Sequence, residues 1–275
     1  MIRAWTGLWT HSYRLGGRWL RRAVTTRRVE DPRGGAYRLL VPVEPWRYYE
    51  LTRVAEHATP GRWLDVGSPK LLASWSRASG RGEWVAVDLL EEEIERWRRI
   101  DPDLDLRVAD ARSLPFPDAS FDGCACISVI EHVVGDGDTQ AMAEIWRVLR
   151  PGGVLHLTTN VAERAHDMLT ADQRYGEVSE QRDEVAFFER RYSDVSVRRR
   201  LLGLPWEELQ REYALERLPV HGAFFAARPW SFAAGGLLAL VCPWNFRRSR
   251  TRPPLDPGEH AVVYLRLRKP ADSAG

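Results

Sequence analysis

One feature of the sequence constrains its fold more than any other. Between residues 62 and 160, short apolar runs alternate with charged stretches of helical period. This alternation is typical of βαβ units built around a parallel sheet. We therefore expect an α/β fold with a doubly wound, mostly parallel sheet and helices on both of its faces. Five strands are expected at 62–66, 83–89, 104–110, 121–129 and 153–159.

Helices are expected between these strands and ahead of them. Residues 69–78, 91–100 and 141–150 have helical spacing, and the second of these segments begins with acids and ends with arginines, as the helix dipole favours. We expect Pro151 to end the third segment. Residues 45–57 predict a lead-in helix that packs on the sheet.

The alternation is lost for about 50 residues after residue 160. A helix is expected there at 194–202. The segment Ala261–Lys269 alternates strongly between apolar and polar residues, which predicts a late antiparallel strand.

The composition excludes several classes of protein. With 44% hydrophobic and 28% charged residues, a chain of 275 residues can bury a normal core. Its formal net charge of +2 gives no global attraction for nucleic acid, so no nucleic-acid partner is expected. The sequence shows no secretory signal and no run of roughly 20 apolar residues, and its three cysteines form no metal-ligand pattern. We expect a soluble, cytoplasmic protein without a metal site.

Three acids stand at or near the carboxyl ends of successive expected strands: Asp65, Asp88 and Asp110. Ligands of open α/β sheets bind outside those strand ends. The step from Asp65 to Asp88 is one βαβ unit, the separation at which an acid reaches a ribose diol. A carboxylate suits that task because it accepts hydrogen bonds from both hydroxyls. Each acid has a structural alternative, since Asp65 and Asp88 could cap the following helices and Asp110 could be a turn residue.

Two longer segments carry a family resemblance. Residues 108–133, VADARSLPFPDASFDGCACISVIEHV, place an acid after the third strand, LPFPDASFD before the fourth and EHV after it. Residues 144–160, EIWRVLRPGGVLHLTTN, supply a helix, an RPGG turn and the fifth strand. With these motifs the sequence resembles the class I S-adenosylmethionine-dependent methyltransferases, in particular the methyltransferase type 11 group, over roughly residues 63–159. The resemblance implies a Rossmann-like fold, S-adenosyl-L-methionine as cofactor, and methyl transfer as the activity.

The resemblance also assigns cofactor contacts at the strand ends. Asp65 would lie at the methionine end of the cofactor, Asp88 would bind the ribose hydroxyls and Asp110 the adenine amino group, while Ser128 would lie near the sulfonium. The full set that it implies is Asp65, Gly67, Ser68, Asp88, Leu89, Asp110, Ala111, Ile127 and Ser128.

The stretch after the first strand departs from the family pattern. The usual DxGxGxG is here DVGSPKL. Gly67 keeps the first close approach of the backbone, but the later glycines are missing and Pro69 removes one amide donor. The Ser68 hydroxyl and the amino terminus of the following helix compensate in part. Because GSPK recurs among these methyltransferases, we expect cofactor binding with an altered geometry, and we expect Lys70 to be a solvated helix residue.

The catalytic residue is left open by the sequence. His132 follows the fourth strand, near the expected entry of an acceptor, and histidine titrates near neutrality as a general base should. The EHV motif occurs in family members with unlike substrates, however, so a structural role for Glu131 and His132 is equally compatible. Methyl transfer can proceed by placement alone, with the nucleophile in line about 3 Å from the methyl group. His132 is the one catalytic candidate.

The chain is expected to divide into four segments. Residues 1–44 form an N-terminal extension or lid, and residues 45–160 the cofactor-binding core. Residues 161–260 form an acceptor-recognition insertion with a late helix and strand, and residues 261–275 complete the core. The extension interleaves tryptophans with arginines. We favour packing of these aromatics on the domain over peripheral membrane contact, because glycines interrupt the amphipathic pattern.

The insertion also holds the expected acceptor-binding residues. Its FFERRY motif, residues 187–192, resembles an element of GSPK relatives. An apolar segment, residues 232–242, could accommodate a hydrophobic substrate or dip into lipid. The aromatic residues that could line an acceptor pocket, or equally be ordinary core, are Trp206, His221, Phe224, Phe225 and Trp230.

The function expected from the sequence is methyl transfer from S-adenosyl-L-methionine to a small-molecule, lipid-like or natural-product acceptor. The alternative is a non-catalytic relative, a binding or scaffold protein whose SPK loop no longer holds cofactor. A nicotinamide-dependent oxidoreductase is disfavoured because the GxGxxG turn is absent. A nucleic-acid methyltransferase is disfavoured by the charge and by the lack of an NPPY-like tetrapeptide after the fourth strand.

Overall fold

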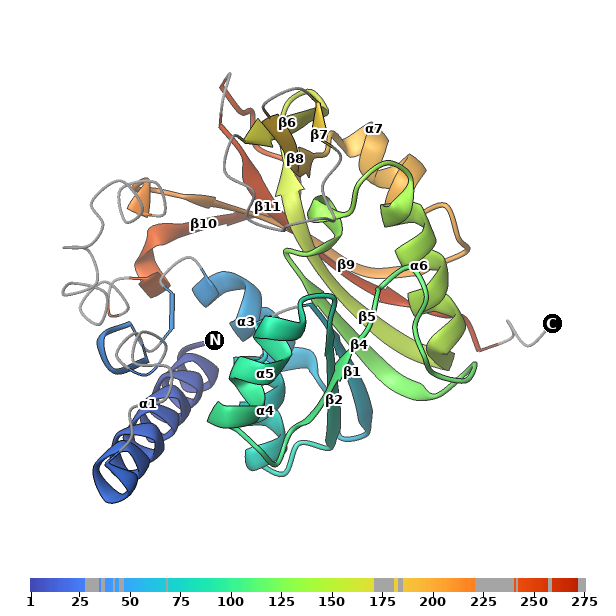
Figure 1. Cartoon of the computed structure of the whole chain (residues 1–275). Coiled ribbons are helices and arrows are strands. Elements are labelled where there is room, and N and C mark those ends of the chain that lie inside the picture. The colour runs from blue at the N-terminus through green and yellow to red at the C-terminus, as the bar shows by residue number, and fades with distance from the viewer. Residues whose placement is uncertain are drawn as a thin grey trace.

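The computed structural model of this chain describes residues 1–27, 35, 38–41, 43, 44, 47–67, 69–170, 181, 182, 185–220, 240, 242–256 and 259–271. Its centre is an eight-stranded sheet of order β10-β9-β11-β5-β4-β1-β2-β3. The expected α/β fold with a doubly wound, mostly parallel sheet is therefore confirmed. Figure 1 shows the sheet with helices packed on both sides.

Five parallel strands form the half of the sheet that the sequence predicts best. They are β1 (Arg62–Val66), β2 (Glu83–Asp88), β3 (Asp105–Val108), β4 (Phe121–Ile127) and β5 (Leu149–Val161). The chain runs outward from β1 through β2 to β3 and then returns to β4 on the other side of β1. The strand order therefore reverses between β1 and β4, and open α/β sheets bind ligands outside the carboxyl ends of the strands at such a point.

The other half of the sheet is antiparallel. The strand β11 (Ala261–Arg268) lies antiparallel between β5 and β9 (Glu207–Glu216), and β10 (Phe246–Ser249) pairs antiparallel with the other edge of β9. The predicted late antiparallel strand is confirmed. Contacts with β11 also explain why β5 begins before its expected start at residue 153: the amide of Gly152 donates to the carbonyl of Lys269 at 2.8 Å, so the RPGG turn is part of the sheet.

Alternate residues of each parallel strand face different helices. Trp63 of β1 belongs to a core shared with α3, α4 and α5, whereas Leu64 belongs to a second core shared with α6. This alternation follows from the two-residue period of a strand and gives a three-layer molecule. The helices of the core are α3 (Arg47–His57), α4 (Leu71–Ala78), α5 (Glu91–Ile100) and α6 (Gly137–Val148).

The amino terminus forms a long helix, α1 (Ile2–Thr26). Its buried side packs on α3 and α4, and the ring of Trp5 meets that of Tyr48 edge-on at 5.0 Å between centroids. This contact agrees with the packing alternative that we favoured for the aromatics, although the helix runs unbroken through Gly16 and Gly17. Figure 1 shows its second half projecting beyond the domain. Within the described residues, no helix has the length and apolar character to cross a bilayer.

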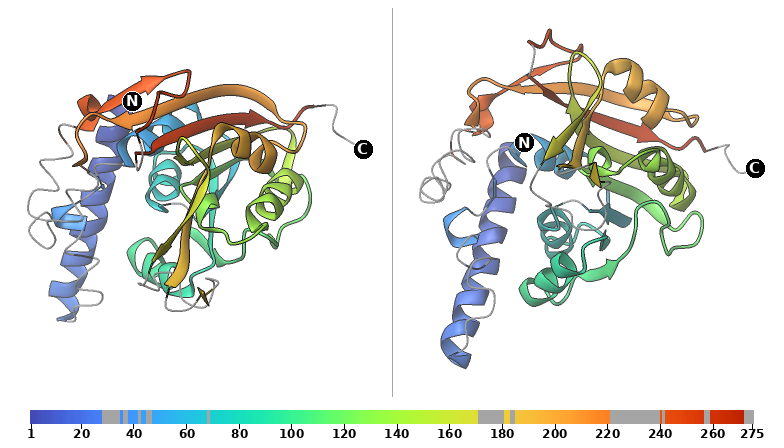
Figure 2. Two further views of the ribbon diagram at one scale, coloured as in Figure 1. Left: turned by 90° about the horizontal axis from the view of Figure 1, so that it is seen from above. Right: turned by 45° about the horizontal axis from the view of Figure 1, so that its top comes forward.

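A second, three-stranded sheet forms where the sequence predicted no regular alternation. Its order is β6-β8-β7, with β6 (His166–Thr170), β7 (Gln181–Arg182) and β8 (Val185–Arg191) all antiparallel. Figure 2 shows β6 and β8 leaving the main sheet as a narrow ribbon. The segment that follows is helical, as expected for residues 194–202: α7 (Asp194–Ser196) continues into the π-helical turn η3 (Val197–Leu201).

Candidate cofactor and acceptor site

The turns that follow β1 and β4 meet at the reversal of strand order. Gly67 has a φ of +56°, and a Cβ atom at this position would lie 2.9 Å from Cγ1 of Val129. Only glycine fits here without strain, both for its backbone angle and for the close approach. The amide of Gly67 also donates to the carbonyl of Val87 at 2.7 Å, which ties the turn to β2.

Asp65 lies inside β1 as the fourth of its five residues. Its side chain is completely buried, on the strand face that it shares with Trp63. Its position agrees with the expected place of the acid at or near the carboxyl end of the first strand, and Gly67 is the first residue beyond that strand. A contact between Asp65 and a cofactor remains a prediction.

Asp88 ends β2, and both of its carboxylate oxygens are engaged. Oδ2 forms an ion pair with Nζ of Lys70, and Oδ1 accepts a hydrogen bond from the amide of Leu90 at 3.0 Å. The expectation that Lys70 is a solvated helix residue is wrong, because this lysine is only 3% exposed. It is the residue at the amino-terminal cap of α4, and its side chain turns back to the neighbouring strand end.

Asp110 lies two residues beyond β3 and is held by its own loop. Its carboxylate accepts hydrogen bonds from the amide of Arg112 at 2.8 Å and from the Arg112 guanidinium at 2.6 Å. These hydrogen bonds lower the pKa of Asp110 below its usual value. The structure leaves Asp110 partly exposed, with Ala111 beside it, and Leu89 is 39% exposed.

The end of β4 is joined to the lead-in helix by a residue that sequence reasoning missed. Glu50, in the first turn of α3, is buried and accepts hydrogen bonds from the hydroxyls of Ser128 and, at 2.8 Å, of Thr158. Ser128 itself has a φ of +48°, a left-handed conformation that non-glycine residues adopt mainly at constrained sites. Ile127 precedes it, fully buried at the end of β4. The only sequence signal for Glu50 was its place on an expected helix.

Glu131 lies in the short 3₁₀ helix η1 (Ile130–His132) directly after this turn. Its side chain is completely buried, and Oε2 accepts a hydrogen bond from the hydroxyl of Thr159 at 3.0 Å. Among the described residues, none hydrogen-bonds to Oε1. Burial above all raises the pKa of Glu131 to about 8; the carboxylates of Glu189 and Glu50 act in the same direction, while the Thr159 hydrogen bond opposes the shift.

His132 is turned toward the second sheet. Its Nδ1 donates to the carbonyl of Phe188 at 2.7 Å, and its ring meets the Phe188 ring edge-on at 5.2 Å between centroids. Burial lowers the pKa of His132 below its ordinary value, so the ring is neutral at pH 7. These contacts anchor β8, which is the structural alternative that the sequence left open. A role for His132 as general base stays a prediction.

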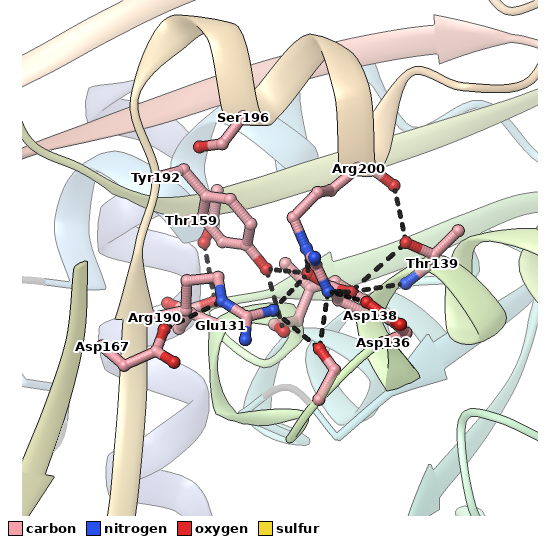
Figure 3. Close-up of polar contacts among 12 residues, drawn as sticks. Glu131, Asp136, Asp138, Thr139, Thr159, Asp167, Arg190, Tyr192, Ser196 and Arg200 are labelled. Atoms are coloured by element: carbon pink, nitrogen blue, oxygen red, sulfur yellow. Dashed lines mark hydrogen bonds and ion pairs between the residues drawn. The ribbon is translucent and has the colours of Figure 1, made fainter. Parts of the chain in front are cut away.

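A buried ion-pair network fastens the second sheet and η3 over the end of β4. At its centre is Asp138, which accepts hydrogen bonds from Tyr192 at 2.9 Å, from Arg190 at 3.0 Å and from Arg200 at 2.7 Å. Figure 3 shows these three side chains converging on Asp138, with Glu131 and Thr159 close by. Burial opposes ionisation, but the hydrogen bonds from Arg200 and Tyr192 hold the pKa of Asp138 below its usual value. We call these four residues the Asp138 clasp.

Only part of the expected aromatic acceptor pocket lies within the described residues. Ser68 of the cofactor set, and His221, Phe224, Phe225 and Trp230, lie outside the described residues, as does most of the 232–242 segment. Trp206 packs edge-on against Trp146 at 4.6 Å between ring centroids. Since Trp146 lies at the end of α6 that leads into β5, Trp206 lies at the opposite edge of the sheet from the strand tips. Trp206 is half-buried against the core there, which agrees with its structural alternative, and its role in an acceptor pocket stays a prediction.

Comparisons with known proteins agree with this geometry. The model of the family described as "Methyltransferase domain" matches residues 64–157. A demethylmenaquinone methyltransferase from Renibacterium salmoninarum is 35% identical over 121 residues, which are 44% of this chain and 48% of the relative. A malonyl-[acyl-carrier protein] O-methyltransferase from Erwinia pyrifoliae is 31% identical over 127 residues, 45% of this chain and 48% of the relative. The chain thus spans about half the length of these curated relatives.

Solved structures share the fold. An S-adenosylmethionine-dependent methyltransferase from Thermotoga maritima superposes with a TM-score of 0.52 at 18% identity, over 92% of this chain and 99% of its own. One from Methanosarcina mazei gives a TM-score of 0.50 at 17% identity, over 80% and 98%. At such identities the likeness concerns the fold alone.

The strand order is that of a doubly wound α/β domain, a class whose ligands bind outside the strand ends where the order reverses. Residues 64–157 match the family model of a methyltransferase domain, so the resemblance to class I S-adenosylmethionine-dependent methyltransferases seen in the sequence is confirmed over that part of the chain. S-adenosyl-L-methionine is the cofactor of that family.

Proposed function

We propose that this chain transfers the methyl group of S-adenosyl-L-methionine to a small-molecule acceptor. The observation that carries the proposal is the meeting of the Gly67 turn with the end of β4, beside the strand-end carboxylates of Asp88 and Asp110. When bound, the cofactor supplies an electrophilic methyl group. It would leave as S-adenosylhomocysteine, keeping the electron pair of the carbon–sulfur bond, and the acceptor would lose a proton.

The residues present fit such a cofactor. Gly67 has no side chain to fill the approach to the strand reversal, and its φ of +56° keeps the turn open to backbone contacts. Asp88 would accept hydrogen bonds from the two ribose hydroxyls, and Asp110 would accept one from the adenine amino group. The chain's own task in the reaction is then to orient the cofactor and to place the acceptor in line with it.

The acceptor would enter at the tips of β4 and β5. The side chains gathered there are polar: Glu50, Ser128, Glu131 and Thr158 lie within one hydrogen-bonded group or directly beside it. Most of these side chains are buried and their oxygens accept hydrogen bonds, which favours an acceptor that reaches them with a donating hydroxyl or amine. Small-molecule methylation also agrees with the name of the demethylmenaquinone methyltransferase, whereas the other relative is named for a malonyl group carried on an acyl-carrier protein.

A second candidate function is favoured by one observation. The Lys70–Asp88 ion pair occupies the carboxylate that would receive the ribose, and the SPK loop lacks the later glycines. A protein that kept the fold for binding or scaffolding, without methyl transfer, would tolerate an Asp88 carboxylate that is already paired with Lys70.

Calorimetric titration with S-adenosylhomocysteine separates the two functions. We expect wild-type protein to bind, and Asp88→Asn to lose at least tenfold in affinity, since a tenfold change needs only about 1.4 kcal/mol and a charge-assisted hydrogen bond contributes about that or more. Asp105→Asn is the matched control, because Asp105 is an exposed acid of β3 paired with Arg107. A wild-type protein that does not bind, or equal affinities for wild type and Asp88→Asn, would contradict the proposal.

A further inference from the structure

The Lys70 side chain is out of place for a helix residue. The chain has only two lysines among its 40 basic residues, Lys70 and Lys269. Lys70 is 3% exposed and ion-paired to Asp88, although the first turn of a helix is a poor place for a cation. Burying an ion pair is costly, and a well-packed apolar residue commonly serves stability as well or better. Stability alone is thus a weak reason for a lysine here.

Lys70 lies directly after the position where the loop lacks a backbone hydrogen-bond donor. The pattern DVGSPKL keeps the first glycine and then loses a backbone donor at Pro69, which has no N–H group. Lys70 follows immediately and offers three donors on a flexible stem. A loop that lacks one amide for an anionic ligand group therefore carries a cation at the next residue.

The charges around Asp88 also favour a ligand anion as a partner of Lys70. Asp88 accepts from the Leu90 amide through Oδ1 and from Lys70 through Oδ2, so the pair is electrically neutral. A diol needs only acceptor lone pairs and brings no charge to match the lysine. The amino-acid end of S-adenosylmethionine, in contrast, is a zwitterion whose carboxylate can pair with a cation. If Asp88 turns to the ribose, Lys70 has a ligand anion to pair with instead.

We propose that Lys70 is a cofactor-binding residue that pairs with the carboxylate of the amino-acid portion of S-adenosylmethionine and is held by Asp88 in the free protein. It takes over the work of the missing loop amide. The compact ammonium suits an exchange between two carboxylates, because it is a point charge that imposes no planar geometry. This inference rests on the proposed function and deepens it.

The test compares two ligands that differ only in the amino-acid portion. S-adenosylhomocysteine carries the carboxylate, whereas 5′-methylthioadenosine keeps the adenosine and the thioether without it. By calorimetry, we expect Lys70→Met to weaken S-adenosylhomocysteine at least tenfold and 5′-methylthioadenosine less than threefold, the difference being the lost charge-assisted contact. Lys70→Arg keeps the charge and should lose less than Lys70→Met.

Lys269→Met is the matched control. Lys269 is the other buried lysine, it donates to the carbonyls of Trp146 and Leu149 at 2.9 Å each, and it lies at the opposite edge of the sheet. We expect its affinities for both ligands to equal those of wild type. Thermal unfolding of every variant confirms folding, and Lys70→Gln, which also removes the charge, decides if Lys70→Met does not fold: a loss for S-adenosylhomocysteine that exceeds the loss for 5′-methylthioadenosine supports the proposal, and equal effects overturn it.

The other outcomes are distinct. Equal losses for both ligands would overturn the proposal and leave Lys70 as a support for Asp88. Equal gains would overturn it by showing that Lys70 blocks the ribose site. If wild-type protein binds 5′-methylthioadenosine but not S-adenosylhomocysteine, Lys70 recognises no carboxylate. If it binds neither, the proposed function itself fails.

Discussion

The carboxyl edge of the parallel sheet has two halves that are built in different ways. The cofactor half, at the tips of β1, β2 and β3, is organised by near neighbours in sequence: Arg112 holds Asp110, and Lys70 reaches Asp88 from 18 positions away. The acceptor half, at the tips of β4 and β5, is organised by distant ones. Glu50 contacts Ser128 across 78 positions, and Arg200 contacts Asp138 across 62.

The halves also differ in how they manage charge. On the cofactor side Asp88 and Asp110 each pair with one cation. On the acceptor side Glu50 and Asp138 also have arginine partners, but Glu131 is buried beside other carboxylates and accepts a hydrogen bond from a hydroxyl. The difference suggests that the cofactor half is assembled as the βαβ units form, whereas the acceptor half depends on docking of α3 and of the second sheet. The following predictions separate the two halves.

The largest effect is expected at the Asp138 clasp. Asp138→Ala should destabilise the protein by about 3–5 kcal/mol in urea unfolding, because it leaves Arg190, Arg200 and Tyr192 without their buried carboxylate. The affinity for S-adenosylhomocysteine should stay within about twofold of wild type, since the clasp belongs to the acceptor half.

The matched control for the clasp is Asp136→Ala. Asp136 also pairs with Arg200, at 3.0 Å, but its side chain is 85% exposed. Exposed pairs contribute about 0–1 kcal/mol, so the control should be nearly neutral. Equal destabilisation by both substitutions, or a large loss of S-adenosylhomocysteine affinity in Asp138→Ala, would contradict the division into halves.

A smaller, pH-dependent effect is expected at Glu131. In the unfolded chain this carboxyl has its ordinary pKa of 4.5, and in the folded protein its pKa is about 8. Between these values the unfolded state loses the proton while the native state keeps it, so the native protein loses stability as the pH rises. Glutamine does not titrate. The stability of Glu131→Gln relative to wild type should therefore rise between pH 5 and pH 8, by on the order of 2 kcal/mol.

Urea unfolding of wild type and Glu131→Gln at both pH values measures this difference, and the pH 5 pair serves as the internal reference. A difference that does not change with pH would mean that Glu131 ionises normally. Burial in the acceptor half would then not alter the ionisation of this carboxyl.

The same contrast explains what the sequence could predict. All five parallel strands, the helices α4 and α5, and β11 follow from short apolar periodicities, and the structure confirms them. The motif between residues 108 and 133 led correctly to the family. These signals are local, because each needs only a few neighbouring residues to define a strand, a turn or a helix.

What the sequence missed depends on tertiary contacts. Nothing near Glu50 indicates that it would reach Ser128. No alternation announced β6 and β8. The chain at β8 is tied to the domain by Arg190 of the Asp138 clasp and by the amide of Tyr192, which donates to the carbonyl of Asn160 at 3.0 Å. Lys70 was misjudged because helical spacing says nothing about a side chain that turns back toward β2. In each case a partner remote in sequence or in another element decides the position.

The most direct test of the account is a crystal structure with S-adenosylhomocysteine bound. We predict electron density for the ligand at the reversal between β1 and β4, with the ribose hydroxyls on Asp88, the adenine amino group on Asp110 and the sulfur facing Ser128. Density elsewhere on the protein, or an ion pair of Lys70 with Asp88 that persists at saturating ligand, would contradict it.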